Sequence, residues 1–253
     1  MPNFNFAEAL EPMMKKVQHR AFSLTEVLLA VATLAIGMMF IGGTFFTGLH
    51  FSTLATERSI AAVVAAEAFA KIALYGINPS DPNLATDRLT RFETLNPIAP
   101  DEFLYPSTKT VGEKQYCWSA LCRPVESGSG NRLVQVTVLV SRKVGSSATY
   151  PGGATKPATV QVAIAAVSGA GNQNKLAIVT PGEQAFIDGG STIVDNRTGR
   201  LYRVLQRDAD APDTIVLDRV WQGAATDSVW VVAPPVAGGR YPCIAIYQKL
   251  ISF

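Results

Sequence analysis

Histidine is nearly absent from this 253-residue sequence, and the two that occur, His19 and His50, lie beside or within a single long apolar stretch. The rest of the chain therefore lacks the imidazole that a hydrolase dyad or a typical zinc site requires. No phosphate-binding loop, dinucleotide fingerprint or calcium-loop spacing occurs in the sequence either. We accordingly predict that the protein is not an enzyme, and we predict no catalytic residue, no cofactor and no metal.

Cysteine is also scarce, and the three cysteines (Cys117, Cys122 and Cys243) are too few for a disulfide scaffold. Cys117 and Cys122 would lie on opposite faces of one extended strand, with Cα atoms roughly 16 Å apart. A disulfide needs a Cα separation of about 4.4–6.8 Å. A bond from one of them to Cys243 and buried free thiols both stay open at this point.

Neither sign of charge is in large excess, because 22 Lys and Arg stand against 20 Asp and Glu. A domain that binds nucleic acid usually carries a marked basic excess, and the balance here predicts no nucleic-acid partner and no acidic substrate.

The most informative absence is local: from Val27 to Thr56 the sequence contains no Asp, Glu, Lys or Arg. A bilayer takes about 20 apolar residues to cross, so this stretch is long enough for a transmembrane helix. Lys15, Lys16 and Arg20 precede it. The positive-inside bias then predicts a single-pass protein with a cytoplasmic N-terminus and an exported C-terminal domain.

One carboxylate, Glu26, stands at the very start of the apolar stretch. A charged group that enters hydrocarbon costs a few kcal/mol, so it usually has an assigned partner. A cut after Ala21 would place a new α-amino group on Phe22, about one helical turn from that carboxylate.

Together with the basic leader, the segment Phe22-Ser23-Leu24-Thr25-Glu26-Val27 resembles the N-terminus of type IV prepilins and type II secretion pseudopilins. The resemblance covers residues 15–75. It implies that a membrane-bound prepilin peptidase removes residues 1–21, that the new amine of Phe22 is methylated, and that Glu26 supports assembly. At the residue before the cut, where the family nearly always has glycine, this chain has Ala21.

Two simpler interpretations of the apolar stretch stand beside this resemblance. In a secretory signal peptide the apolar region precedes the cleavage site, whereas here it follows the site, and no small-x-small pattern closes it. A plain signal anchor fits the hydropathy equally well but gives Glu26 no role.

The helical pattern continues from Phe22 to about Tyr75, where Gly76 provides a C-terminal cap. We divide this helix into a transmembrane half, residues 22–51, and an exported half, residues 52–76. Apolar side chains surround the exported half on nearly all sides: Ile60, Val63, Val64, Phe69, Ile72 and Leu74. Such a helix needs cover on several sides, either from its own domain and neighbouring subunits together or from its own domain alone.

Gly42 and Gly43 interrupt the apolar stretch. Each costs about 1 kcal/mol of helix propensity relative to alanine. Glycine in a membrane helix often serves only close packing. The resemblance to pilins suggests a second role, in which both residues weaken the helix so that it unwinds locally on assembly.

The remaining sequence predicts an α+β fold, in which the long transmembrane and amphipathic helix packs on an antiparallel sheet. Residues 77–170 are expected to form a connecting loop and that sheet, with a short helix from Leu84 to Leu95. Residues 171–253 are predicted to form an additional C-terminal β-rich lobe of short strands, either a small barrel or an added sheet. Asp195-Asn196-Arg197-Thr198-Gly199 predicts a tight hairpin within it.

Six aspartates near the predicted turns of this lobe could gather at one loop end and hold Ca²⁺, as in some pseudopilins: Asp188, Asp195, Asp208, Asp210, Asp213 and Asp218. Acidic residues near turns are far more often simply solvated, so we predict no metal.

The sequence as a whole is most similar to minor pilins or minor pseudopilins of the PilV-like type. The expected partners are the prepilin peptidase, other pilin or pseudopilin subunits and the lipid of a bacterial inner membrane. The alternative hypothesis is a binding module at a filament tip or on a membrane anchor, whose C-terminal β region recognises a surface, DNA or a secreted protein.

Overall fold

The computed structural model describes residues 23–78, 80–84, 87–125, 133–145, 148–239 and 241–253. It forms two compact units, Met1–Leu54 and Ala55–Phe253. The predicted processing residues Ala21 and Phe22 and the rest of the leader lie outside the described residues.

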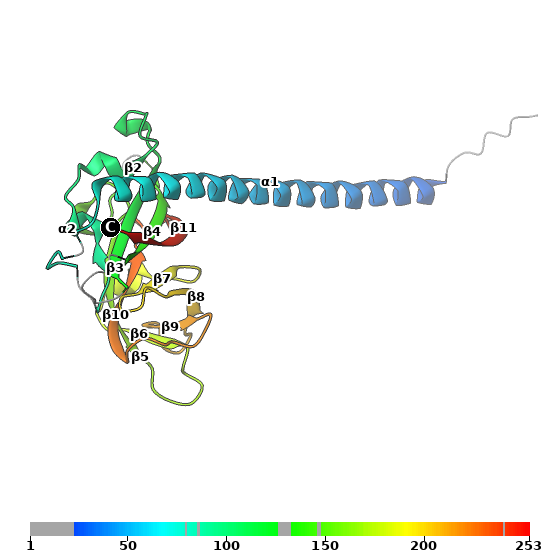
Figure 1. Cartoon of the computed structure of the whole chain (residues 1–253). Coiled ribbons are helices and arrows are strands. Elements are labelled where there is room, and N and C mark those ends of the chain that lie inside the picture. Colours follow the sequence, from blue (N-terminus) through cyan, green and yellow to red (C-terminus); the bar gives the residue numbers. More distant parts are fainter. Residues whose placement is uncertain (1–22, 79, 85–86, 126–132, 146–147, 240) are drawn as a thin grey trace, which may run out of the picture. The chain divides into compact units, whose positions relative to one another are not determined.

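The long helix α1 (Leu24–Tyr75) supplies all the described regular structure of the first unit and continues into the second (Figure 1). It ends where the sequence predicts, because Gly76 adopts a φ of 75° and donates its backbone N–H to Ile72 O at 3.0 Å. This left-handed conformation is inexpensive only for glycine, and it satisfies one of the last helical carbonyls.

A five-stranded antiparallel sheet forms the first part of the second unit (Figure 1). Its central strands are neighbours in the chain, and its edge strand β11 is the last strand of the protein. The strands are β1 (Thr90–Arg91), β2 (Leu104–Tyr105), β3 (Tyr116–Pro124), β4 (Leu133–Arg142) and β11 (Cys243–Ser252). The order is β1-β3-β4-β11, with β2 also paired to β3.

The other strands close a six-stranded antiparallel barrel in the order β10-β5-β6-β9-β8-β7. They are β5 (Thr159–Ala166), β6 (Lys175–Ile178), β7 (Thr192–Asp195), β8 (Leu201–Arg207), β9 (Thr214–Leu217) and β10 (Thr226–Val232). Of the two arrangements left open by the sequence for the C-terminal lobe, the barrel is the one observed. Closure gives each of these six strands a partner on both sides, so that they share no open sheet edge.

The predicted division at residue 170 differs from the strand pairing. β5 lies before that boundary but pairs with β6 and β10 in the barrel, and β11 lies after it but pairs with β4 in the sheet. The barrel is thus inserted between β4 and β11. Sequence order cannot reveal such an insertion, because β4 and β11 are joined by hydrogen bonds between residues far apart in the chain.

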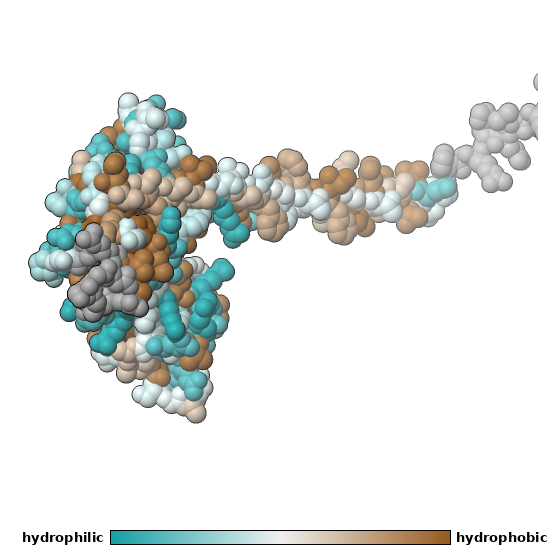
Figure 2. Space-filling view, viewed as in Figure 1, coloured by the Kyte–Doolittle hydropathy of each residue, from teal (hydrophilic) through white to brown (hydrophobic). Residues whose placement is uncertain are grey.

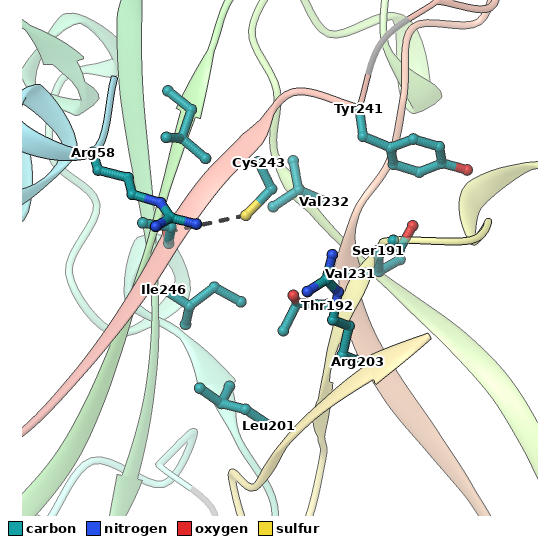
Figure 3. A pocket seen from close by; sticks show the side chains of 13 residues that line it. Arg58, Ser191, Thr192, Leu201, Arg203, Val231, Val232, Tyr241, Cys243 and Ile246 are labelled. Atoms are coloured by element: carbon teal, nitrogen blue, oxygen red, sulfur yellow. Dashed lines mark hydrogen bonds between the residues drawn. The ribbon is translucent and has the colours of Figure 1, made fainter. Parts of the chain in front are cut away.

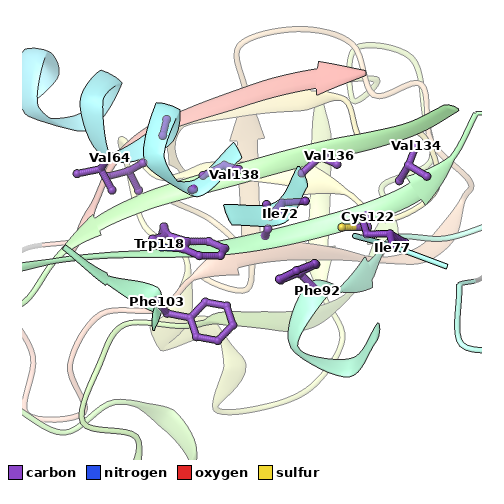
Figure 4. Packing of buried hydrophobic residues seen from close by; sticks show 14 of the residues in the cluster. Val64, Ile72, Ile77, Phe92, Phe103, Trp118, Cys122, Val134, Val136 and Val138 are labelled. Atoms are coloured by element: carbon purple, nitrogen blue, oxygen red, sulfur yellow. The ribbon is translucent and has the colours of Figure 1, made fainter. Parts of the chain in front are cut away.

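One face of the sheet packs against the C-terminal part of α1 (Figure 4). Alternate residues of β3 and β4 point to this face, among them Trp118, Val136 and Val138. A single stripe of α1 meets them: Ala61, Val64, Ala65, Ala68 and Ile72. Burial of each larger aliphatic side chain stabilises the fold by roughly 1.5–3 kcal/mol, so this stripe accounts for the attachment of helix to sheet.

The opposite face of the sheet is covered by the barrel. Leu121 of β3 and Leu139 of β4 form a cluster with Val194, Trp230 and Val232 of β7 and β10. The barrel also has an apolar core of its own, with Ile164, Leu176, Ile193, Val204, Ile215 and Val229 inside it. Residues on both faces of β3 and β4 are therefore buried.

The helix predicted from Leu84 to Leu95 is reduced to the short α2 (Phe92–Leu95), and the prediction is wrong for the described residues before it. Thr90 and Arg91 pair with β3 instead, and the backbone N–H of Leu89 binds Asn196 O at 2.7 Å. Tertiary pairing with a strand and with the barrel outweighs the weak helix propensity of this segment. Short 3₁₀ turns occur at Pro100–Phe103, Val111–Glu113, Pro151–Gly153 and Glu183–Phe186.

The predicted hairpin at residues 195–199 is present between β7 and β8. Asp195 is fully buried, and its carboxylate accepts hydrogen bonds from the backbone N–H groups of Arg197 and Thr198. Gly199 has a φ of 70° and donates its N–H to Asp195 O at 2.9 Å. The aspartate therefore stabilises the turn from within, as Asx turns do.

Candidate functional site

The start of α1 carries the residue for which the sequence predicts a special role. Ser23 caps the helix, because its Oγ accepts the backbone N–H of Glu26 at 3.2 Å. Glu26 lies in the first turn and its side chain is exposed. A carboxylate in this position is favoured by the positive end of the helix dipole. The Ser-x-x-Glu spacing thus stabilises the start of the helix. This local role of Glu26 is additional to the role in assembly that the sequence predicts.

Apolar side chains are exposed along the first unit (Figure 2). Within the described residues, α1 is the helix that is long and apolar enough to span a membrane. Its threonine hydroxyls are satisfied within the helix, since Thr33, Thr44, Thr47 and Thr53 each donate to a backbone carbonyl one turn earlier. An unsatisfied hydroxyl would be costly in hydrocarbon, so this pattern suits an apolar surrounding.

Gly42 and Gly43 lie within the continuous helix. A Cβ added at either position would meet no atom of the described residues within 4 Å. Within this single chain, then, neither glycine is required for close contact. Their two predicted roles, packing in the membrane and weakening of the helix, both concern other surroundings and stay predictions.

The C-terminal part of α1, residues 55–75, is buried along one stripe. Val63 is 53% exposed and Leu74 is 82% exposed, whereas Val64 and Ile72 on the neighbouring stripe are fully buried. The expectation of apolar residues on several sides thus holds, and the protein's own sheet covers one of those sides. Ile60 and Phe69 are partly buried at the edges of the covered stripe, and Val63 and Leu74 lie outside it.

A charged network holds the end of α1 to the loop before β2. Lys71 Nζ lies 3.2 Å from Glu67 Oε1 and 2.8 Å from Glu102 Oε2, and it also donates to the carbonyl of Glu102 at 2.8 Å. Trp118 Nε1 donates to the same carbonyl at 3.1 Å. The network is therefore tied to the aromatic core, where the Trp118 and Phe103 rings lie 4.7 Å apart.

The six aspartates considered for Ca²⁺ do not converge, and the described residues contain no group of three or more acidic, histidine or cysteine side chains that could hold a metal. Asp208 pairs with Lys175 at 2.5 Å, which lowers the pKa of its carboxyl. Asp218 bonds the backbone N–H of Arg203 and the guanidinium of Arg219. Asp208 and Asp218 are thus engaged by basic side chains and backbone N–H groups of the barrel.

All three cysteines are free thiols. As the odd spacing predicts, Cys122 belongs to the cluster on the helix side of the sheet, and Cys117 lies outside that cluster, near the carbonyls of Ser141 and Pro157. Burial raises the pKa of Cys117 to about 12, and it does the same for Cys243. Neither is therefore a thiolate nucleophile at neutral pH.

A cavity of about 350 Å³ lies between β11 and the barrel, and no pattern in the sequence predicts it (Figure 3). Two arginines from distant parts of the chain, Arg58 of α1 and Arg203 of β8, line it. Its other polar groups are Ser191, Thr192, Tyr241 and Cys243, and its apolar wall includes Leu201, Val231, Val232 and Ile246. Nothing in the spacing of these residues signals that they meet.

The described residues thus define an α+β protein with one helix able to span a membrane, a sheet packed on that helix, and an inserted barrel with a basic cavity beside it. No protein-family model, curated protein or solved structure matches the chain.

Proposed function

We propose that this chain is a minor subunit, a pilin or pseudopilin, of a type IV pilus or type II secretion-like filament. It is inserted in the bacterial inner membrane through the first part of α1 and assembles after a prepilin peptidase has cut the chain behind Ala21. The observation that carries the proposal is the start of α1. There one carboxylate, Glu26, precedes an uncharged apolar run from Val27 to Thr56 whose larger side chains are exposed.

The chemistry of this arrangement suits assembly between subunits. Cleavage behind Ala21 leaves a positively charged, methylated amine on Phe22. That charge needs a counter-charge once the helix leaves the membrane face for a helix bundle of low dielectric. Glu26 of an adjacent subunit supplies a carboxylate of the right sign close to the same depth.

The fold of the second unit supports the same proposal. One stripe of α1 is buried against the sheet, while Val63 and Leu74 stay exposed. A helix with an open apolar face gains stability when neighbouring copies cover it, as they do in a filament core.

The decisive experiment is mass spectrometry of the mature N-terminus after co-expression with a prepilin peptidase. We expect a chain shortened by residues 1–21 that begins with N-methyl-Phe22, and we expect the same shortening for the matched variant Ala21→Gly. A catalytically inactive peptidase serves as the control. Recovery of the full-length chain alone, or of a chain cut beyond Phe51, would contradict the proposal. The apolar segment would then be a signal anchor in the first case and a signal peptide in the second.

The inserted barrel favours a second candidate, a binding module. Six strands between β4 and β11 form a closed barrel in which each strand pairs with two others of the same six. Under this alternative the barrel, held at a filament tip or on the membrane, recognises a surface, DNA or a secreted protein. The two candidates differ in one measurement: a binding module keeps its partner in a pull-down from cells that make no filament, whereas a structural subunit is defined by its presence in sheared filaments.

A further inference from the structure

The cavity between β11 and the barrel carries an inference that does not depend on the proposed filament role. Its described walls contain two arginines and no acidic residue. Among the residues that the structure describes, neither Arg58 nor Arg203 forms an ion pair, although eight other cations of the same unit, from Lys71 to Arg219, are paired with carboxylates. Two uncompensated positive charges therefore face one cavity.

The two guanidinium groups enter the cavity from different sides (Figure 3). Arg58 reaches in from α1 and points toward Cys243, and Arg203 extends along Thr192 from the barrel. A planar guanidinium presents several N–H donors in a fork that matches a carboxylate or a phosphate. Arginines on two sides can thus hold one oxyanion between them.

The hydroxyl groups of the cavity add neutral donors. Thr192 lies next to Arg203, and Ser191 is hydrogen bonded to Tyr241 and also accepts the backbone N–H of Asp188 at 3.1 Å. Asp188 is itself engaged by Arg207 at 3.7 Å and does not line the cavity. No carboxylate of the described cavity wall competes with an incoming anion for the two arginines.

The backbone of β11 is irregular where it borders the cavity. The pairing with β4 shifts register between Cys243 and Ala245, which places Ile244 as an extra residue in the strand. Such bulges turn side chains out of the regular alternation and are frequent beside binding sites. Here the bulge brings three consecutive residues, Cys243, Ile244 and Ala245, to the same cavity.

The remaining wall is apolar and comes from both bodies, with Leu201 and Val231 on the barrel side and Ile246 on the sheet side. A small-molecule site typically combines such a wall with a few convergent polar groups, in a cavity of about 300–1,000 Å³. The observed volume of about 350 Å³ lies at the small end of this range. This volume fits a compact ligand.

We propose that this cavity binds a small organic anion. Its carboxylate or phosphate group lies between Arg58 and Arg203, and its short apolar part lies against Leu201 and Ile246. Because the ligand contacts α1, the barrel and β11 together, its binding stabilises the junction of these three elements.

The test uses the full chain in an uncharged maltoside detergent, so that the detergent supplies no anion. The three tryptophans, Trp118, Trp221 and Trp230, all belong to the second unit, so their fluorescence reports its thermal unfolding. The probes are inorganic phosphate, formate and butyrate, at constant ionic strength, with n-butanol as an uncharged match for butyrate. We expect a saturable rise in the unfolding temperature with butyrate or phosphate, a weaker effect of formate than of butyrate, and none with n-butanol.

Matched variants locate the site. Arg58→Gln and Arg203→Gln should each weaken the binding of the effective probe by about tenfold or more, since each removes a charge-assisted hydrogen bond. Arg200→Gln removes the same charge next to the same strand but outside the cavity, and it should leave binding unchanged. Arg203→Lys keeps the charge without the fork and should retain intermediate affinity, which guards against a fold lost through the Gln substitution.

Each outcome decides the proposal. The head group is a carboxylate if butyrate binds and phosphate does not, and a phosphate in the reverse case; in both cases loss of binding in the two Gln variants supports the site. The proposal is overturned if no probe saturates, if both Gln variants bind as tightly as the unaltered chain, or if n-butanol stabilises the protein as much as butyrate does.

Discussion

Arg142 Nη1 lies 3.0 Å from Oε1 of Glu57, and this ion pair joins the end of β4 to α1. Glu57 is the first charged residue after the run that ends at Thr56. Its side chain is 7% exposed, whereas that of Arg142 is 46% exposed. The pair thus marks the point where α1 changes from an uncharged apolar helix to one that is docked on the sheet.

We expect Arg142→Met to destabilise the second unit by about 1–3 kcal/mol, because it removes the ion pair that Arg142 forms with the buried carboxylate of Glu57. Adding Glu57→Gln should recover part of that loss, since the uncharged amide costs less to bury. Denaturant unfolding followed by tryptophan fluorescence measures both effects. Arg200→Met, at an exposed arginine that is in no ion pair with a described residue and lies outside the cavity beside β11, is the control, and equal stability of the two Met variants would show that the pair contributes nothing.

A chain of residues 55–253 should fold without detergent. Its three apolar clusters lie within this unit, and the exposed apolar run of the first unit is removed. The circular dichroism spectrum should indicate mixed helix and strand. An unfolded or all-helical product would mean that the sheet and barrel need the membrane segment.

Glu26→Ala should leave cleavage behind Ala21 and the fold of the second unit intact but keep the chain in the membrane. Removing one partner of a charge pair in apolar surroundings leaves the other uncompensated, at a cost of about 3–5 kcal/mol. Glu26→Gln separates charge from size. The measurement is the amount of the chain in shear-released filaments, with the membrane fraction as control. If both variants enter filaments as well as the unaltered chain does, Glu26 has no role in assembly and only stabilises the start of the helix.

The buried thiols predict a loss of stability at alkaline pH. Burial raises the pKa of Cys117 from its ordinary value of 9.0 to about 12, so the folded state keeps a proton that the unfolded chain releases. Stability is thus fully present below pH 9 and falls as the pH rises from 9 toward 12. The slope is up to about 1.4 kcal/mol per pH unit for each such thiol.

The comparison with Cys117→Ala isolates this effect, because all other titrating groups are common to both chains. The variant should show a shallower fall in the free energy of unfolding between about pH 9 and 10.5. Identical slopes would mean that Cys117 is accessible to water in the folded protein.

Gly199 is the glycine at which substitution should be most harmful to the junction of barrel and sheet. Its φ is 70°, and an added Cβ would lie 2.7 Å from Nε2 of Gln135 on β4. The left-handed conformation alone costs about 1–2 kcal/mol for alanine. Gly171→Ala is the matched control, because Gly171 also has a positive φ of 87° but its Cβ would meet no described atom within 4 Å. We expect Gly199→Ala to destabilise the protein more than Gly171→Ala in denaturant unfolding, and equal losses would show that Gln135 moves aside freely.

Features that depend on near neighbours in the chain can be predicted from the residues alone. The cap at Gly76 and the turn from Asp195 to Gly199 follow from the conformational preferences of single residues. The alternation in β4 follows from the two-residue period of a strand, and the uncharged run from Val27 to Thr56 needs no partner to be recognised.

The folded structure was needed to show which distant segments meet. It placed β11 beside β4 and closed the six other strands into a barrel, because strand pairing is chosen by burial and hydrogen bonding among segments that the sequence keeps apart. It likewise brought Arg58 and Arg203 to one cavity. No local pattern encodes that meeting, since the helix and the barrel strand that carry the two arginines are far apart in the sequence.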